Sequence, residues 1–488
     1  MKKITIKNKK SFILIALIAS LLPNAGCKKY LDIALPSNQI AGEGAFLTDA
    51  STSSVLSGIF YNIVNSSFTA GSSSIGFESS LYTDELTNIN PNSPANAAFY
   101  TNNIQSANVV AIWNDSYKQI NACNVAIEGI NNSKSVLTNK NQYLGEAYFA
   151  RAWLFFNLVN LYGGVPLAIT TDYKVNNTLS RATTAQVNAQ ILSDLKMAQS
   201  LLPDGFHDGT GSVTALRTRP GKAAATALLA RFYLYTGDWA NAEAQSSDVI
   251  GNADFKLGLL SQTFLATGNN EAIWALSPTG AGFVADYNTY NGGMPATIPA
   301  GSTRTILSYN AAASLSDSEL STFEPNDGRF TTWIRSTFDE ASNKTYYFPN
   351  KYKANVNGVE NVIVLRLAEQ YLIRAEARAR QNTNISSAQG DLNALRTRAG
   401  LAATAAANQA DLLTAVLKER RCELFTESGH RFFDLKRTGT IDAVMTVVAQ
   451  QKSTNAVPVT WNAQKQLWPI SATDIIINPN LAQNPGYN

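Results

Sequence analysis

Residues 143–167 read YLGEAYFARAWLFFNLVNLYGGVPL, and this stretch decides the fold class. Within 144–162 the apolar and aromatic residues recur at spacings of three and four, the period of one face of an α-helix. Gly163-Gly164 then ends the run, and Val165-Pro166 predicts an extended exit, because glycine ends helices and proline cannot continue them. The stretch therefore predicts a long helix whose apolar face packs against other elements.

The same spacing recurs along the chain. It predicts further helices, whereas strand-like pieces are few, at 271–277 and 361–366; the predicted helices are 109–130, 184–202, 221–236, 367–381, 385–399 and 409–428. Several helices form pairs, and Gly237-Asp238 separates 221–236 from a second helix that starts at Trp239. The small and aromatic residues around this break resemble a tetratricopeptide repeat: Leu228, Tyr235, Gly237, Trp239 and Ala242. One pair cannot bury its own apolar face, so we expect several pairs to stack.

Long stretches rich in Asn, Ser, Thr and Gly separate the helices. They are too long for simple turns, and loops of this length in a compact protein are usually functional or ordered by packing. We therefore expect a mostly α fold, in which tetratricopeptide-like helix pairs form a scaffold packed against an irregular loop-rich lobe with a few short strands. We expect one domain over 46–488, with the scaffold mainly in 46–64, 103–162, 184–250 and 365–437 and the ligand lobe mainly in 65–102, 278–362 and 440–488.

The N-terminus has the pattern of an export signal. Five lysines and no acidic residue precede the apolar run 12–22, which spans ~16 Å as a helix, about half of a ~30 Å hydrocarbon core. Residues 1–26 therefore predict a cleaved signal peptide, with an amphipathic or signal-anchor helix as the alternative. Cys27 follows Ala25-Gly26 directly, as in bacterial lipoproteins, although Asn24 stands where leucine is usual. We expect an acylated Cys27 and a tether over 27–45, the alternative being an ordinary thiol.

The charge of the chain excludes one class of partner. The 488 residues carry a formal charge of +3, and only 15% of them are charged. Without the five lysines of 1–26, the 39 basic residues fall to 34 against 36 acidic ones, a balance of −2. Such a mature chain has no basic field for a phosphate backbone, so we expect no nucleic acid partner.

Blocks along nearly the whole chain resemble the SusD/RagB family of outer-membrane lipoproteins. The blocks follow the family's order and are CKKYLDIALPS (27–37), the stretch 143–167, RPGKAAATALLARFYLYTGDWANA (219–242), VLRLAEQYLIRAEARAR (364–380), LNALRTRAGL (392–401), VLKERRCELFTESGHRFFDLKRTG (416–439) and LWPISATDIIINPNLAQNPGY (467–487). The resemblance implies a lipid-anchored protein on the extracellular side of the outer membrane. It also implies a SusC-like TonB-dependent β-barrel partner, an oligosaccharide or peptide ligand, and no catalysis.

A charged run near the C-terminus invites a catalytic interpretation. Glu423 and Glu427 lie close to His430 in the sequence. The simpler interpretation is a network of ion pairs on a helix surface, such as Glu427 with Arg431 four residues later. The resemblance favours this network, since the family uses the block as a signature of its fold.

The sequence gives no motif for a cofactor. Its two histidines, His207 and His430, exclude a His-rich metal site, while a structural calcium ion in a loop such as 203–211 stays open. Cys123 and Cys422 lie in helical apolar contexts, so we expect buried free thiols, although spacing cannot exclude a disulfide.

Ligand candidates come from the irregular polar stretches. Sugar rings stack on aromatic faces and their hydroxyls need amide or carboxylate partners, and peptides need similar surfaces. The candidates are Tyr82, Asp84, Tyr100, Tyr287, Asn288 and Tyr290. Trp113 and Tyr117 on a helical stripe, and Trp274 in a strand-like run, fit the core instead.

The function we expect is capture of an oligomeric nutrient, a glycan in preference to a peptide, for import through the barrel. Two alternatives stay open. One is a secreted glycan hydrolase with two carboxylates about 5–10 Å apart. The other is a tetratricopeptide-type scaffold that binds other envelope proteins, although the long aromatic loops argue against it.

Overall fold

A computed structural model describes residues 44–487, except 91, 279–281, 292 and 310. The predicted signal peptide, Cys27 and nearly all of the tether lie outside the described residues. The chain from Phe46 to Asn488 forms one compact unit.

Helices dominate this unit, as predicted. The α-helices are α2 (Asp49–Val64), α3 (Ile75–Tyr82), α4 (Pro94–Tyr100), α5 (Ser106–Asn131), α6 (Lys140–Tyr162), α7 (Tyr173–Asn176), α8 (Thr184–Leu201), α9 (Lys222–Thr236), α10 (Trp239–Gly251), α11 (Asp317–Leu320), α12 (Gly328–Trp333), α13 (Leu367–Gln381), α14 (Ile385–Arg398), α15 (Gln409–Leu424), α16 (His430–Arg437), α17 (Ile441–Lys452) and α18 (Ala472–Ile477). The strands are β1 (Leu86–Asn88), β2 (Ala272–Leu276), β3 (Thr297–Ile298), β4 (Ala313–Leu315), β5 (Ile334–Asp339), β6 (Lys344–Pro349) and β7 (Val362–Arg366). None of the helices in the described ranges is long and apolar enough to cross a membrane.

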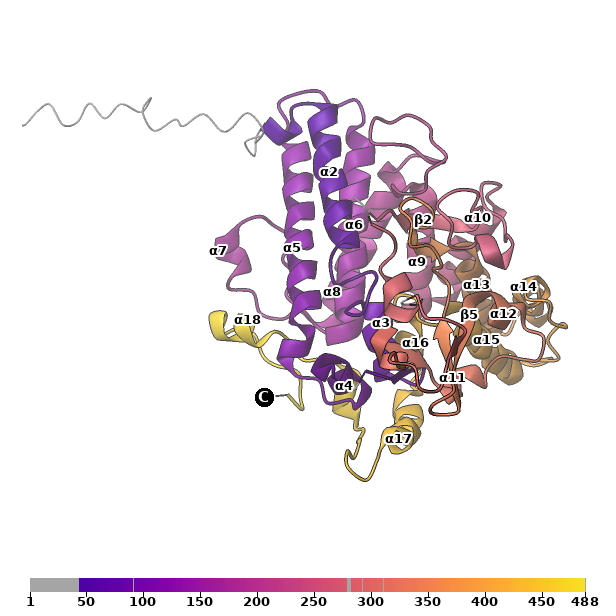
Figure 1. Cartoon of the computed structure of the whole chain (residues 1–488). Helices are drawn as coiled ribbons and strands as arrows, with labels where there is room; N and C mark the ends of the chain where they lie inside the picture. Colours follow the sequence, from indigo (N-terminus) through magenta and orange to yellow (C-terminus); the bar gives the residue numbers. More distant parts are fainter. Residues whose placement is uncertain (1–43, 91, 279–281, 292, 310, 488) are drawn as a thin grey trace, which may run out of the picture. The chain divides into compact units, whose positions relative to one another are not determined.

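The stretch 143–162 lies in α6, the central helix of the first group. α2, α5 and α8 run alongside it (Figure 1), and they bury it on nearly every side. Gly163 ends α6 with a φ of 74°, a left-handed value that glycine adopts without strain. Gly164 then lets the exit segment run so close to Ala182 that an added Cβ would clash with the Ala182 carbonyl oxygen. The two glycines therefore fix how the chain leaves the central helix.

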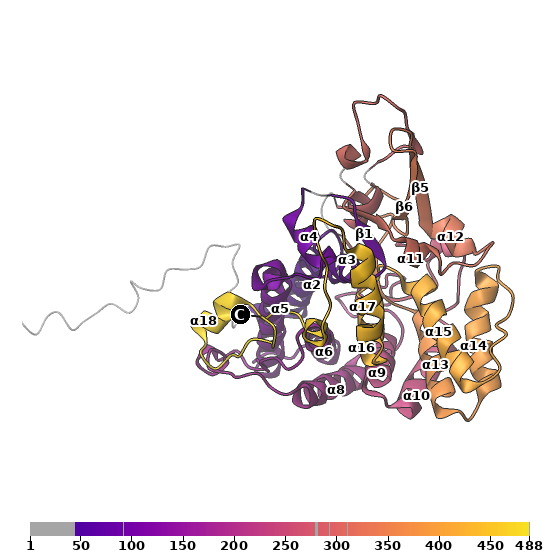
Figure 2. The same ribbon diagram turned by 90° about the horizontal axis from the view of Figure 1, so that it is seen from below.

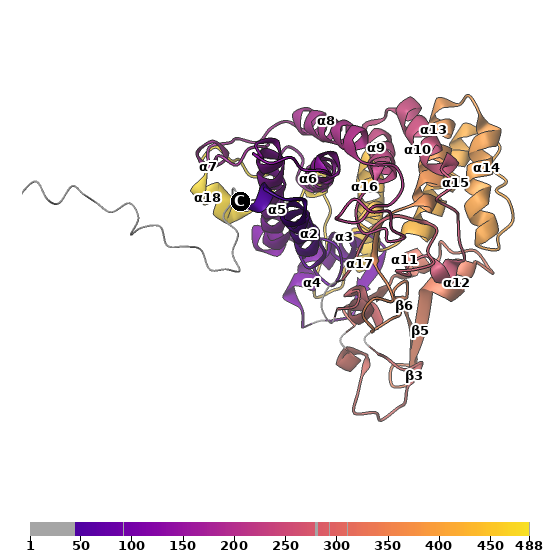
Figure 3. The ribbon, with the colours of Figure 1, turned by 90° about the horizontal axis from the view of Figure 1, so that it is seen from above.

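The second group contains the predicted helix pairs. α9 and α10 pack together, α10 packs on α13, and α13 packs on α14 and α15 (Figures 2 and 3). Small alanines of α13 and leucines of α14 and α15 form a shared core, which allows close approach of the helices. Gly237 separates α9 from α10 in the left-handed conformation, at φ 78°. The stacking that the sequence predicted is confirmed.

The two strand-like pieces pair with each other. β2 and β7 form an antiparallel ladder between the helix groups, and every residue of both strands is buried. Trp274 in β2 is fully buried and packs edge-on against Phe149 and Trp153 of α6. Both strands and the interior position of Trp274 match the prediction.

The remaining strands build a smaller lobe. β3, β5 and β6 form a sheet that projects away from the helices (Figure 3), and a satellite core of Met294, Ile298, Ile306, Ala311 and Phe348 lies beneath it. β1 pairs with β4 in antiparallel register, with Leu86 opposite Leu315. This ladder brings the segment 65–102 against the segment 278–362. The predicted fold class, a helical scaffold with a lobe of loops and short strands, is confirmed.

The predicted loops contain more helix than the sequence pattern indicated. α3 and α4 lie within 65–102, and α17 lies within 440–488. All eight residues of α3 are buried, so it has no polar face and no amphipathic period. Periodicity alone therefore could not find it.

Candidate ligand-binding hollow

A polar hollow of about 370 Å³ opens between the two segments that the β1–β4 ladder joins. We call it the ligand hollow, and seven residues line it: Ser72, Asn90, Ser93, Asn96, Asn288, Thr289 and Ala312. Hydroxyl and amide groups dominate this lining, and none of the seven side chains is charged. Such groups both donate and accept hydrogen bonds, as the hydroxyls of a neutral sugar require.

One wall is the start of α4. Ser93 caps the helix, and its side-chain oxygen accepts a hydrogen bond from the Asn96 N–H at 3.2 Å. Pro94 occupies the first helical position, where its missing N–H costs nothing. The cap and the proline therefore fix the direction of the helix and the position of Asn96 in the hollow.

The opposite wall is the π-helical turn Tyr287–Asn291, which carries Asn288 and Thr289. The Thr289 carbonyl accepts a hydrogen bond from the Ala312 N–H at 2.9 Å. Just before the turn, the Asp286 carboxylate accepts a hydrogen bond from the Gly71 N–H at 2.6 Å. Asp286 therefore joins the loop that carries Ser72 to the turn that carries Asn288.

The environment of Asp286 shifts its ionisation. Burial raises the pKa of Asp286 to about 7, and the Glu427 carboxylate raises it further. The Gly71 N–H and the Lys351 ammonium lower the pKa, but burial outweighs them. Asp286 therefore changes charge near neutral pH beneath the wall of the hollow.

Of the six predicted ligand residues, one lines this hollow, and two more lie on the elements that carry its lining residues. Asn288 lines it and is exposed. Tyr287 precedes Asn288 in the turn and is half-buried. Tyr100 lies one helical turn after Asn96, and the Lys452 ammonium is 4.7 Å from its ring centroid. The structure thus brings the segments of these three residues together, and their contact with a ligand stays a prediction.

The other three predicted residues, which the sequence assigned to irregular polar loops, are buried in the structure. Tyr82 is fully buried at the end of α3, and its hydroxyl donates to the Lys465 carbonyl at 2.9 Å. Asp84 is buried and pairs with Arg431 at 2.8 Å and Arg421 at 3.0 Å. Tyr290 is buried and packs against Phe77. Their partners satisfy them within the protein, which explains their positions without a ligand.

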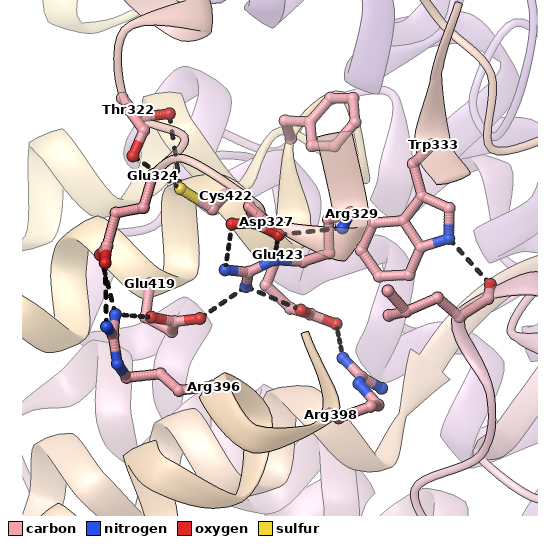
Figure 4. Close-up of polar contacts among 12 residues, drawn as sticks. Thr322, Glu324, Asp327, Arg329, Trp333, Arg396, Arg398, Glu419, Cys422 and Glu423 are labelled. Carbon is pink, nitrogen blue, oxygen red and sulfur yellow. Dashed lines mark hydrogen bonds and ion pairs between the residues drawn. The ribbon is translucent and has the colours of Figure 1, made fainter. Parts of the chain in front are cut away.

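The charged run of the C-terminal signature lies in a buried cluster of carboxylates and arginines (Figure 4). Arg329 lies between Asp327 at 2.8 Å and Glu419 at 2.6 Å, and it also contacts Glu423 at 3.1 Å. Glu423 binds Arg366 at 2.6 Å and also pairs with Arg398. Despite its burial, these arginines hold the pKa of Glu423 well below its usual range.

This cluster corrects the predicted ion pair. Glu427 pairs with Arg366 at 2.8 Å and Lys351 at 2.5 Å, and not with Arg431, which binds Asp84. The predicted pair was placed on a helix surface, but α15 ends at Leu424 and the chain turns before α16 begins. The interpretation as an ion-pair network is correct, whereas its surface position is wrong. Burial lowers the pKa of His430 well below its usual value, and several nearby arginines add to this effect.

The metal and thiol predictions concern other parts of the chain. Asp208, in the loop considered for calcium, accepts hydrogen bonds from Thr210 and Ser212. Across the described ranges, no group of three or more His, Cys, Asp or Glu side chains is arranged to hold a metal ion. Cys123 and Cys422 are buried free thiols, as predicted, and burial raises the pKa of each to about 12.

Sequence reasoning missed most of the hollow. The predicted candidates, most of which are tyrosines, do not include five residues of its lining: Ser72, Asn90, Ser93, Asn96 and Thr289. A usable signal was present in NINPNSPAN (88–96), where amides and a hydroxyl are interrupted by prolines. This composition indicates an ordered polar loop, and four of its residues border the hollow or the strand beside it.

Two known families match this chain. A family described as "Starch-binding associating with outer membrane" matches residues 30–234, and the SusD family matches residues 334–487. SusD-like protein P2 of Formosa agariphila is 25% identical over 527 aligned positions, which cover 97% of this chain and 99% of that protein.

Solved structures share the fold. A SusD superfamily protein from Bacteroides thetaiotaomicron superposes with a TM-score of 0.73 at 23% identity, over 90% of this chain and 100% of that one. A laminarin-binding SusD-like protein superposes with a TM-score of 0.71 at 23% identity, over 91% of this chain and 100% of that one. The helical scaffold with its polar lobe is therefore that of a SusD-like protein. The chain belongs to the SusD/RagB family, as its sequence blocks predicted.

Proposed function

We propose that this protein captures a neutral oligosaccharide in the ligand hollow at the cell surface. The observation that carries the proposal is the lining of the hollow, which offers amides and hydroxyls and no charged side chain. Desolvation of a neutral sugar costs little free energy at such a lining, because its hydroxyls exchange hydrogen bonds to water for hydrogen bonds to the protein. A charged ligand would find no counter-ion there.

The family supports a glycan in preference to a peptide. One relative of the same fold is a laminarin-binding protein, and one matched family is described as starch-binding. The volume of the hollow, about 370 Å³, is at the small end of the usual range of about 300–1,000 Å³ for ligand sites. We infer that it holds a short part of a longer chain, and we expect Tyr100 and Tyr287 to stack on the sugar rings that extend beyond it.

The delivery step is also part of the proposal. An acylated Cys27 would anchor the protein in the outer membrane, because two acyl chains bury enough methylenes for stable attachment. A SusC-like TonB-dependent barrel would then receive the captured glycan. In this role the protein binds and transfers its ligand without cleaving it.

Calorimetry with the purified protein tests the capture step. Laminarin oligosaccharides and neutral peptides of similar size serve as ligands, and mass spectrometry of the recovered ligand reports cleavage. We expect oligosaccharide binding that Asn288→Ala weakens at least tenfold, because the amide loses its hydrogen bonds. Asn114→Ala, an exposed amide on α5, is the matched control and should bind like the wild type.

Each part of the proposal has its own contradicting result. If the Asn288→Ala variant binds the oligosaccharide as tightly as the wild type does, the hollow is not the binding site. Peptide binding without glycan binding would contradict the ligand class, and shortened ligands would show an enzyme. Delivery needs a separate test in cells, where affinity purification should recover a TonB-dependent barrel and external protease should digest the protein. An intact protein in protease-treated whole cells would contradict the surface location.

A further inference from the structure

A second hollow, of about 320 Å³, lies beside the short helices α7 and α18. Both helices lie on the same side of α5 in Figure 1, α7 level with its middle and α18 nearer its lower end, and Figure 2 shows α18 beside α5 from another side. Six of its lining residues determine its chemistry: Trp113, Tyr117, Tyr173, Asn176, Asp474 and Ile477. We call it the aromatic pocket. It shares no lining residue with the ligand hollow.

The rings of the pocket are held in fixed positions. Trp113 and Tyr117 lie one turn apart on α5, with ring centroids 4.9 Å apart. The Trp113 indole N–H donates to the Asp474 carboxylate, and the Tyr117 hydroxyl donates to the Pro166 carbonyl at 2.9 Å. The polar atoms of both rings are engaged inside the protein, and Trp113 is only 2% exposed, so Tyr117 presents more aromatic surface to the pocket than Trp113 does. Tyr173 adds a third ring, with 66% of its surface exposed.

The pocket has an excess of acceptor groups. Asp474 forms no ion pair with any basic side chain in the described part of the chain, and no lysine or arginine lines the pocket. The Asn176 side-chain oxygen is buried without a hydrogen-bond donor, while its nitrogen donates to the Thr170 carbonyl at 2.7 Å. A buried acceptor without a donor is costly, so the site favours a ligand that brings donors and positive charge.

The surface around the pocket is apolar. Large apolar side chains of the exit segment, α7 and α18 are exposed there, namely Ile169 at 43%, Tyr173 at 66%, Val175 at 46%, Ile476 at 83% and Ile477 at 68%. An apolar rim of this kind marks a protein interaction site more often than a site for a small soluble molecule.

We propose that the aromatic pocket binds the arginine or lysine side chain of a protein partner, whose apolar residues cover the surrounding rim. Aromatic faces attract a cation through their quadrupoles, and Asp474 supplies the opposite charge. Arginine is enriched among the residues that dominate protein interfaces, because it combines charge with a flat stacking surface. The proposal concerns a surface separate from the ligand hollow and does not depend on the proposed function.

The test compares two peptides that differ only in charge. Acetyl-Ile-Arg-Ile-amide and its citrulline counterpart have nearly the same shape, but citrulline is neutral. Each is titrated into the purified wild-type protein and into Asp474→Asn, which keeps an acceptor for Trp113 and loses the charge. Asp204→Asn removes an exposed carboxylate elsewhere, whose side chain is 86% exposed, and serves as the matched control.

We expect the arginine peptide to bind the wild type at least tenfold more tightly than the citrulline peptide. Asp474→Asn should remove this difference, and Asp204→Asn should keep it. Equal binding of the two peptides by the wild type, or no binding of either, overturns the proposal without any need for a variant.

A further pair of measurements examines the rim. The double variant Val175→Ser, Ile476→Ser changes two exposed rim residues that do not line the pocket, so the fold should tolerate it. We expect this variant to bind the arginine peptide at least threefold more weakly, while its affinity for n-butylguanidinium stays unchanged. If n-butylguanidinium binds the wild type as tightly as the peptide does, the pocket is a site for small cations and the protein-partner proposal fails.

Discussion

Asp286 joins the turn that carries Asn288 to the loop that carries Ser72, and its ionisation gives a prediction on pH. Burial, with a contribution from Glu427, raises its folded-state pKa to about 7, above the ordinary value of 3.8. Between pH 4 and 7 the unfolded chain is ionised at this residue while the folded protein holds the proton. The folded state therefore loses stability from this group as the pH rises through that window.

The variant Asp286→Asn should remove this loss. The asparagine side chain would keep an acceptor for the Gly71 N–H but would not ionise. Relative to the wild type, we expect the unfolding free energy of the variant to rise by on the order of 1–2 kcal/mol between pH 4.5 and pH 8. This figure is lower than the full pKa shift would give, because the side chain is only half-buried. Urea unfolding at both pH values measures the difference, and parallel pH dependences of the two proteins would contradict it.

Glu423 lies at the centre of the buried carboxylate–arginine cluster. Its replacement by glutamine leaves Arg366, Arg398 and Arg329 with less opposite charge in a site that water does not reach. Breaking a buried pair of this kind costs about 3–5 kcal/mol. We therefore expect Glu423→Gln to lower the unfolding free energy by about that amount in urea titrations.

A carboxylate at the edge of the same cluster provides the control. Glu324 binds Arg396 and Lys418 with its side chain 34% exposed. Since exposed ion pairs contribute about 0–1 kcal/mol, Glu324→Gln should cost less than ~1 kcal/mol. Similar losses for both variants would show that burial does not decide the contribution of these pairs.

At the scale of the elements, the path of the chain after α6 requires glycine at position 164. A Cβ there would clash with the Ala182 carbonyl oxygen, so the backbone must shift to admit it. Overpacking of this kind costs about 1–3 kcal/mol. We expect Gly164→Ala to destabilise the protein by about 2 kcal/mol or more in thermal or urea unfolding.

Gly251, the last residue of α10, is the matched substitution. An added Cβ there meets nothing within 4 Å, and alanine favours helix. Gly251→Ala should therefore be neutral or slightly stabilising. Equal destabilisation by the two alanines would show that the contact with Ala182 is not the cause.

The elements also show how far the sequence alone could go. α6, α9 and α13 were predicted within a few residues of their bounds, because glycines end two of them and apolar residues recur at helical spacing. α3 was missed because its burial on all sides removes that period. The site was harder to predict, because Asn96 and Asn288 are far apart in sequence. Their segments are joined by long-range contacts such as the β1–β4 ladder and the Asp286–Gly71 hydrogen bond. The local sequence pattern does not predict such long-range contacts.

On the scale of the whole chain, two hollows of similar size have opposite chemistry. The ligand hollow has amide and hydroxyl groups without charge, whereas the aromatic pocket has three rings and the Asp474 carboxylate. Attraction between exposed charges is screened over about 10 Å at 0.1 M salt and about 3 Å at 1 M, while hydrogen bonds to a neutral sugar do not depend on ionic strength in this way.

Ionic strength should therefore separate the two sites in one protein. Between 0.05 M and 0.5 M sodium chloride, we expect the affinity for a laminarin oligosaccharide to change less than twofold. Over the same range, the affinity for acetyl-Ile-Arg-Ile-amide should fall at least threefold, because its guanidinium loses part of the attraction to Asp474. Calorimetric titrations measure how the affinity for each ligand changes with salt concentration. The citrulline peptide controls for effects of salt on apolar contacts. If the affinity for the oligosaccharide depended strongly on salt, this would contradict an uncharged site. If the affinity for the arginine peptide did not depend on salt, this would contradict the role of Asp474.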